Sequence, residues 1–247
     1  MGIAAVALAL GAIVYWLLVV TEGTYLGPHV VILLYDWTAR RYDRVKDLHY
    51  VDEARYLGLP LAKALEPVRS PWVLDVATGT GRVPLALMRE RDFEGTVVAV
   101  DRSHGMLTEA KMVTGDWDGR VALIREDTGA LSFADGSFDC VTCLEALEFM
   151  TDPSAVVAEM VRVLRPGGAL LLSNRIGRDA WCFPGRVRGR GRLEKYLHQL
   201  GLQNIRTERW QVHYDLVWAC KALAPEHAVA APIARQMPER NERAAVT

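Results

Sequence analysis

Residues 73–81 read Val-Leu-Asp-Val-Ala-Thr-Gly-Thr-Gly, and the rest of the chain is organised around them. Residues 73–76 form a short apolar run interrupted by one carboxylate, which is typical of a buried parallel strand. Two glycines follow at alternate positions, and residues 82–91 are expected to form a helix. A strand, a tight glycine-rich turn and a helix N-terminus place backbone N–H groups around a small concave site. The stretch therefore predicts the nucleotide-binding corner of a doubly wound α/β fold.

Two common nucleotide-binding motifs do not fit this turn. A dinucleotide fingerprint requires a third glycine at position 84, which is proline, and the chain has no Gly-Lys-Ser/Thr phosphate-binding loop. The spacing Asp75-x-Ala77-x-Gly79-x-Gly81 instead resembles motif I of the class I S-adenosylmethionine-dependent methyltransferases.

Segments further along the chain resemble the same family in the same order. The run 96–100 ends at Asp101, about twenty positions after the turn, where an acidic residue binds ribose hydroxyls. In the family segment that 101–107 resembles, the residue matching Met106 packs against adenine. Asp127 matches an aspartate that accepts from the adenine amino group. The most specific match is Val-Leu-Arg-Pro-Gly-Gly at 163–168, read as the turn before a strand at 169–173.

The resemblance covers roughly residues 71–222 and implies both a fold and a cofactor. The fold is a doubly wound seven-stranded sheet with its last strand antiparallel, and the cofactor is S-adenosylmethionine. The implied cofactor-binding residues are Asp75, Ala77, Gly79, Thr80, Gly81, Asp101, Arg102, Met106, Asp127, Thr128 and Leu144.

No catalytic residue follows from the resemblance. Glu145, Glu148, His104 and His213 are candidates for a general base, although each is equally expected in a structural or exposed role. No metal-ligand cluster stands out in the sequence, which disfavours metal-dependent methylation, and no Asn-Pro-Pro-Tyr motif points to adenine or glutamine methylation.

Composition narrows the class of protein. The 247 residues suit one α/β domain with additions, and 29 basic against 30 acidic residues give a net charge of −1. No overall basic field for nucleic acid results. Four cysteines are too few for a disulfide framework. Cys140 and Cys143 are three positions apart in an expected strand, so they point to opposite faces and are expected in the core.

Residues 2–20 carry no charge. As a helix they would be roughly 28 Å long, close to the hydrocarbon thickness of a bilayer. Tyr15 and Trp16 suit an interfacial anchor. A cleaved signal peptide and a buried core helix are the alternatives. The nearest basic residues, from Arg40 to Lys46, follow this segment, which favours a single-pass membrane protein with its globular domain in the cytoplasm.

The regions between anchor and domain, and after the domain, complete the expected organisation. Residues 1–26 are read as the transmembrane anchor, 27–70 as a helical cap broken near Pro60, 71–222 as the methyltransferase domain and 223–247 as a disordered tail. Tyr35-Asp36 and Tyr42-Asp43 resemble pairs in the family's cap helices. An amphipathic solvated helix with its tyrosines on the packing side is the alternative, and the sequence slightly favours it.

Residues 175–195 contain seven basic residues, several of them in the run Gly-Arg-Val-Arg-Gly-Arg-Gly-Arg. Nucleic-acid binding is disfavoured because few aromatic residues are interleaved. Contact with anionic lipid headgroups and an ordinary solvated loop both remain open.

Three hypotheses for function follow. The first is a methyltransferase acting on a membrane-dissolved lipid or quinone-like acceptor. The second is a methyltransferase acting on a water-soluble small molecule. The third is a non-catalytic, membrane-tethered binding module, which the intact acidic positions 75, 101 and 127 disfavour.

Overall fold

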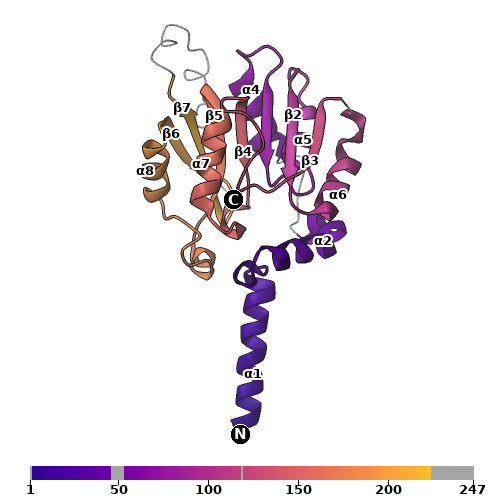
Figure 1. The fold of residues 1–247 in the computed structure, drawn as a ribbon, viewed down its shortest axis with the longest axis vertical. Helices are drawn as coiled ribbons and strands as arrows, with labels where there is room; N and C mark the ends of the chain where they lie inside the picture. Colours follow the sequence, from indigo (N-terminus) through magenta and orange to yellow (C-terminus); the bar gives the residue numbers. More distant parts are fainter. Residues whose placement is uncertain (1, 46–52, 118, 224–247) are drawn as a thin grey trace.

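A computed structural model describes residues 2–45, 53–117 and 119–223, and its globular part is built on one seven-stranded sheet (Figure 1). The strands lie in the order β3-β2-β1-β4-β5-β7-β6. β7 is antiparallel to both β5 and β6, whereas the other pairs are parallel. The predicted seven-stranded sheet with an inserted antiparallel last strand is confirmed. The strands are β1 Trp72–Val76, β2 Thr96–Asp101, β3 Val121–Arg125, β4 Phe138–Cys143, β5 Leu164–Arg175, β6 Leu202–Arg209 and β7 Tyr214–Lys221.

Helices cover both faces of this sheet. Met160 of α7 and Leu197 of α8 belong to one buried cluster, and Leu61 of α4 and Leu87 of α5 belong to the other. Cys140 and Cys143 lie in opposite clusters, both as buried free thiols, so the prediction from their spacing is confirmed. The longer helices are α1 Gly2–Tyr15, α2 Pro28–Val45, α4 Leu59–Leu65, α5 Arg82–Met88, α6 His104–Thr114, α7 Pro153–Val163 and α8 Arg192–Gln199. Short helical turns are η1 Trp16–Val20, η2 Thr24–Leu26, η3 Ala54–Gly58, η4 Gly115–Trp117, η5 Leu147–Phe149 and η6 Arg178–Cys182.

The structure differs from the sequence-based expectation at two predicted chain breaks, the Arg-Pro-Gly-Gly turn and Pro60. The Arg-Pro-Gly-Gly turn lies inside β5: Phe138 pairs with Leu164 but Cys140 pairs with Ala169, so extra residues of β5 bulge out of the ladder. The break predicted near Gly58 is a change of helix type: the π-helical turn η3 ends at Gly58, and α4 begins at Leu59 with Pro60 in its first turn, where no N–H is needed.

The N-terminal helix projects away from the sheet (Figure 1). Among the described residues, Gly2–Val20 is the one helix long and apolar enough to cross a membrane, and none of it is buried. The C-terminal end of this helix is attached to the domain by side-chain contacts. Trp16 stacks on Tyr25 with ring centroids 5.3 Å apart, and the Tyr25 hydroxyl donates to the carbonyls of Cys182 (3.4 Å) and Pro184 (3.3 Å). The tail expected at 223–247 lies, apart from its first residue, outside the described residues.

Candidate functional site

A cavity of about 400 Å³ lies where β1 and β4 diverge, at the carboxyl ends of the strands. This is the switch point of a doubly wound sheet, where ligands bind in such folds. Its volume is in the range of small-molecule sites. One side is formed by the loops after β1, β2 and β3, and the other by α2 and η5.

The turn after β1 presents its backbone to the cavity. Ala77 and Gly79 both have φ of +56°, and the Thr78 N–H donates to the Val100 carbonyl at 3.0 Å, tying the turn to β2. A Cβ built on Gly79 would meet nothing within 4 Å, so the peptide there faces open space. Asp75, beneath the turn, accepts from the Thr142 hydroxyl at 2.6 Å, and burial raises its pKa to about 6.

Asp101 closes the second side of the turn. Its two carboxylate oxygens accept from the backbone N–H groups of Gly79 (Oδ2, 2.9 Å) and Ser103 (Oδ1, 2.9 Å). Burial raises the pKa of Asp101, and these backbone hydrogen bonds oppose that shift. The carboxylate is therefore held rigidly at the rim of the cavity, with lone pairs left for ligand hydroxyls.

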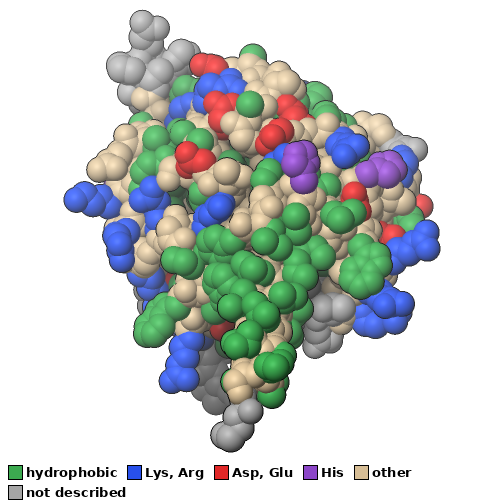
Figure 2. Space-filling view, turned by 60° about the horizontal axis from the view of Figure 1, so that its bottom comes forward, with side chains coloured by type: hydrophobic (Ala, Val, Ile, Leu, Met, Phe, Trp, Pro, Cys, Tyr) green, Lys and Arg blue, Asp and Glu red, His purple; other side chains and the backbone are tan. Residues whose placement is uncertain are grey.

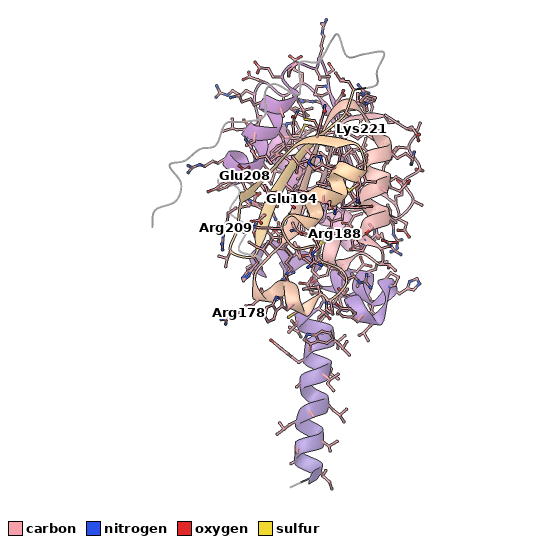
Figure 3. All side chains as sticks on the ribbon, turned by 90° about the vertical axis from the view of Figure 1, so that its left-hand side faces the viewer. Arg178, Arg188, Glu194, Glu208, Arg209 and Lys221 are labelled. Carbon is pink, nitrogen blue, oxygen red and sulfur yellow. The ribbon has the colours of Figure 1, made fainter. Side chains whose placement is uncertain are left out.

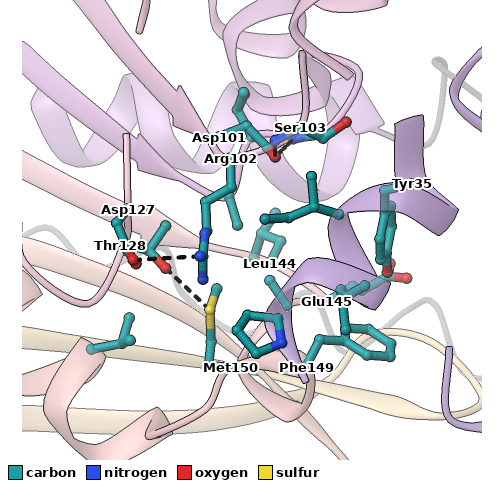
Figure 4. A pocket seen from close by; sticks show the side chains of 18 of the residues that line it. Tyr35, Asp101, Arg102, Ser103, Asp127, Thr128, Leu144, Glu145, Phe149 and Met150 are labelled. Atoms are coloured by element: carbon teal, nitrogen blue, oxygen red, sulfur yellow. Dashed lines mark hydrogen bonds and ion pairs between the residues drawn. The ribbon is translucent and has the colours of Figure 1, made fainter. Parts of the chain in front are cut away.

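The loop after β3 forms the far end of the cavity (Figure 4). Arg102 reaches across to Asp127, with Nη2 3.6 Å from Oδ2, and the Thr128 hydroxyl donates to the sulfur of Met150 at 3.2 Å. Leu144, at the end of β4, lies between this end and Glu145. The far end thus combines a polar rim with apolar walls.

Nearly all the residues expected to bind the cofactor line this one cavity, with two exceptions. Met106 is 1% exposed and is absent from the lining, because the side chain of this first-turn residue is directed into the core. Gly81 is the N-cap of α5 at φ +85°, and a Cβ there would lie 3.1 Å from that of Ala110. Gly81 therefore permits close packing of α5 on α6. The expected residues that line the cavity are Asp75, Ala77, Gly79, Thr80, Asp101, Arg102, Asp127, Thr128 and Leu144.

Helix α2 forms a wall that the sequence only suggested. Tyr35 and Tyr42 line the cavity, while their neighbours Asp36 and Asp43 anchor the helix. Asp36 accepts from the Ser103 hydroxyl at 2.5 Å and from the Gly105 N–H at 2.8 Å, and Asp43 accepts from the Thr80 hydroxyl at 2.6 Å. The two tyrosines thus face the cavity, and the two aspartates bind the loops beside it, as the resemblance to a cap helix implies.

The tyrosines of this wall are neutral phenols. Burial raises the pKa of Tyr35 well above its usual range, and Glu22, which accepts from its hydroxyl at 2.6 Å, adds to the shift. Burial, and then the charge of Glu145, raise the pKa of Tyr42. Both side chains present aromatic surface to the cavity.

The four candidate general bases are dispersed. Glu145 lines the cavity, whereas Glu148 is buried beside it and accepts from the Tyr214 hydroxyl and from Arg175. His104 is exposed, and His213 pairs with Asp179 at 3.1 Å. Among the described residues, no group of three or more His, Cys, Asp or Glu side chains is arranged to hold a metal ion.

The basic segment after β5 is engaged largely within the protein. Arg186 donates to the Met150 carbonyl, and Arg188 donates to the Ser154 hydroxyl at 2.7 Å. Arg190 binds Asp215, a fully buried carboxylate, with both nitrogens at 2.6 Å. These arginines hold the loop against the domain, so their charges are already partly compensated.

Comparison with known proteins agrees with the fold. Residues 74–172 match the family model of a methyltransferase domain. The chain is 37% identical over 148 residues to a demethylmenaquinone methyltransferase of Renibacterium salmoninarum, covering 59% of each chain. It is 38% identical over 102 residues to a ubiquinone/menaquinone biosynthesis C-methyltransferase of a Marinomonas species, covering 40% of this chain and 41% of that protein. The chain thus spans 59% of the length of the first of these relatives.

The fold is shared with solved structures. A SAM-dependent methyltransferase of Aquifex aeolicus superposes with a TM-score of 0.51 at 21% identity, covering 61% of this chain and 81% of that one. At this identity the match concerns the fold alone.

Proposed function

Residues 74–172 form a class I S-adenosylmethionine-dependent methyltransferase domain, and on this premise we propose that the protein is a membrane-anchored enzyme that methylates a hydrophobic, quinone-like acceptor. The observation that carries the proposal is the continuity of the cavity. It runs from the glycine-rich turn to α2, the first long helix after the apolar Gly2–Val20 segment. The relatives named for demethylmenaquinone and ubiquinone methylation support the acceptor class.

The cavity suits the donor at the end formed by the strand loops. The open space above Gly79 admits a ligand to the backbone, and Asp101 offers carboxylate lone pairs at a ribose-binding position. Asp127 and Thr128 would border the adenine, and Leu144 and Met150 its apolar surroundings. When bound, S-adenosylmethionine supplies a methyl group already activated by its sulfonium. The residues of the chain need only hold the two partners in line and exclude water.

The other end of the cavity suits an apolar ring. Val31, Ile32 and Tyr35 of α2 face Phe149 of η5, and the rings of Tyr35 and Phe149 meet edge to face at 6.0 Å. Phe149 in turn meets Phe183 at 5.4 Å, which continues the aromatic wall into the loop packed against the N-terminal junction. These side chains bind by burial of apolar surface rather than by specific hydrogen bonds.

The surface around the base of α1 suits the membrane interface. Hydrophobic side chains gather there with Lys and Arg at the margins (Figure 2). Trp37 and Trp181 are 81% and 84% exposed, an uncommon state for tryptophan, and both suit the headgroup level. Arg178 lies beside the same end of α1 (Figure 3), and Arg40 and Arg41 on α2 are also exposed. Basic residues on this side of the helix favour a cytoplasmic location for the domain.

The proposal is tested on the full chain in lipid nanodiscs containing demethylmenaquinol, with S-adenosylmethionine carrying a labelled methyl group. Mass spectrometry of the lipid extract should show labelled menaquinol. The variant Asp101→Ala should lose about tenfold or more of donor affinity, because buried partners would be left unsatisfied. A parent protein that binds the donor but labels only a water-soluble acceptor would contradict the hydrophobic acceptor.

A further inference from the structure

The acceptor end of the cavity contains a buried triad of charged side chains, and the proposed function gives these side chains no role. Arg82, the first residue of α5, lies between two carboxylates: its Nε is 2.9 Å from Glu53 Oε2, and its Nη1 is 2.8 Å from Glu145 Oε1. All three side chains are 11% exposed or less. Arg82 and Glu145 both line the cavity.

The triad leaves hydrogen-bonding capacity at the cavity. Nη2 of Arg82 is buried and has no hydrogen-bond partner among the residues that the structure describes. On Glu145, Oε1 accepts from both Arg82 and Gln211 (2.9 Å), whereas Oε2 accepts no bond from any described residue. Buried polar atoms are nearly always paired, because an unpaired one loses its hydration without compensation. A group that enters the cavity can supply the missing partners.

The guanidinium is fixed and charged. Its Cζ lies over the indole ring of Trp210, 4.6 Å from the ring centroid, so the group packs against an aromatic face. Burial alone would lower the pKa of Arg82, but the carboxylates of Glu145 and Glu53 raise it. Arg82 therefore stays a cation at every physiological pH and always donates.

Glu145 is held in place at the cost of backbone strain. It is a non-glycine residue at φ +49°, in the left-handed region, and its N–H donates to the Ser173 hydroxyl. A residue in this conformation persists only where surrounding contacts hold it in place, and such residues are concentrated at ligand sites. Here Ser173, Arg82 and Gln211 together orient one carboxylate toward the cavity wall.

We propose that Arg82 Nη2 and Glu145 Oε2 form a subsite for a ring hydroxyl of the acceptor. A hydroxyl accepts one hydrogen bond and donates another, so it matches a guanidinium N–H beside a free carboxylate oxygen. A ring bound in this way is fixed in rotation, and the subsite thereby selects which ring atom faces the donor end. The inference rests on the proposed function for its acceptor, and it assigns the reduced, hydroxyl-bearing form of a quinone-like ring rather than the dicarbonyl form.

The test measures binding, not turnover. The full chain in detergent, saturated with S-adenosylhomocysteine, is titrated by calorimetry with 1-naphthol and with 1-methoxynaphthalene. The two probes share the ring, but only 1-naphthol can donate. We expect 1-naphthol to bind about tenfold or more tightly, the range of a hydrogen bond to a charged group. Equal affinities in the parent protein would overturn the subsite whatever the variants do.

Two conservative variants test whether Arg82 and Glu145 cause the preference for 1-naphthol. Arg82→Lys keeps the positive charge but removes the fork that carries Nη2, and Glu145→Gln keeps the shape but removes the charge. Each should reduce the preference for 1-naphthol to about threefold or less, with binding of 1-methoxynaphthalene unchanged. The control is Arg165→Lys, which alters an arginine paired with buried Asp139 at 2.6 Å, outside the cavity lining. The control should keep the parental preference.

The outcomes separate this inference from the proposed function. Parental preference retained in both Arg82→Lys and Glu145→Gln, with normal thermal unfolding, would refute the subsite and leave methyl transfer intact. Failure of the parent protein to bind S-adenosylhomocysteine would instead remove the proposed function itself.

Discussion

Gly79 and Gly81 belong to one sequence motif but serve different purposes. Both lie at positive φ, +56° and +85°. A Cβ at Gly79 would enter open space, whereas one at Gly81 would lie 3.1 Å and 3.2 Å from Cβ and Cα of Ala110 on α6. Sequence spacing alone assigns both glycines to the ligand, because it does not show which of them a neighbouring helix approaches.

This difference predicts opposite outcomes for two matched substitutions. Both Gly79→Ala and Gly81→Ala introduce strain of about 1–2 kcal/mol from a left-handed residue. Gly81→Ala adds about 1–3 kcal/mol of overpacking, so its melting temperature should be the lower of the two. Gly79→Ala should show the larger loss of S-adenosylmethionine affinity by calorimetry. The reverse order would mean that the cavity above Gly79 is not the donor site.

Asp75 makes stability depend on pH in an unusual direction. Burial raises its pKa to about 6 in the folded protein, from its ordinary value of 3.8. The folded state therefore disfavours the charged carboxylate. Above pH 6 this destabilises the protein by about 3 kcal/mol, and the penalty disappears as the pH falls below about 4. Asp75→Asn should thus raise the free energy of unfolding of the donor-free protein at pH 8, and raise it by about a third as much at pH 4.5. Denaturant unfolding at the two pH values measures this. An equal effect at both pH values would show that folding does not raise the pKa of Asp75.

At the scale of elements, the strands follow from sequence more closely than the cap does. Apolar runs bounded by turn residues placed β1 and β2 within a residue, because strand burial is a local pattern. The role of α2 could not be read in the same way. Its contact with Ser103 joins residues 67 positions apart, and neither partner signals the other locally. The path of β5 through Arg-Pro-Gly-Gly is likewise set by its partner strand rather than by turn chemistry.

The contact between α2 and α6 is predicted to close the cavity. Asp36 receives hydrogen bonds from Ser103 and Gly105, and a Cβ on Gly105 would lie 2.9 Å from the Asp36 backbone. Asp36→Ala should destabilise this docking by about 1–3 kcal/mol. Hydrogen exchange of residues 28–45 should therefore quicken, while exchange in β1 and β4 stays unchanged. Asp116→Ala, on the short turn η4, is the control. Unaltered exchange in α2 would show that other contacts hold it.

At the scale of the molecule, the apolar helix and the domain are joined by a built junction rather than a loose linker. Thr21 and Thr24 are buried, Tyr25 packs between Trp16 and the loop after β5, and Glu22 accepts from the Tyr35 hydroxyl in the cavity wall. Such a junction fixes the height of the cavity above the bilayer if the helix spans it. A hydrophobic acceptor would then enter along α2 without crossing water.

Two truncations distinguish the anchor from the junction. Removing residues 1–15 deletes α1 but keeps Trp16, Glu22 and Tyr25, whereas removing residues 1–26 deletes the junction as well. We expect the full chain to resist carbonate extraction from membranes, because burying an apolar helix of this length in lipid is effectively irreversible. Both truncations should lose that resistance.

The shorter truncation should keep S-adenosylmethionine affinity within about threefold, since it leaves every contact of the cavity wall in place. The longer one should melt several degrees lower, because it removes the Tyr25 hydroxyl that binds the Cys182 and Pro184 carbonyls and leaves Tyr35 without its acceptor. N-terminal sequencing of the protein in the membrane fraction decides whether the helix is retained or cleaved. A mature N-terminus beyond residue 20 would identify the helix as a cleaved signal, and the membrane-facing entry would then have no anchor.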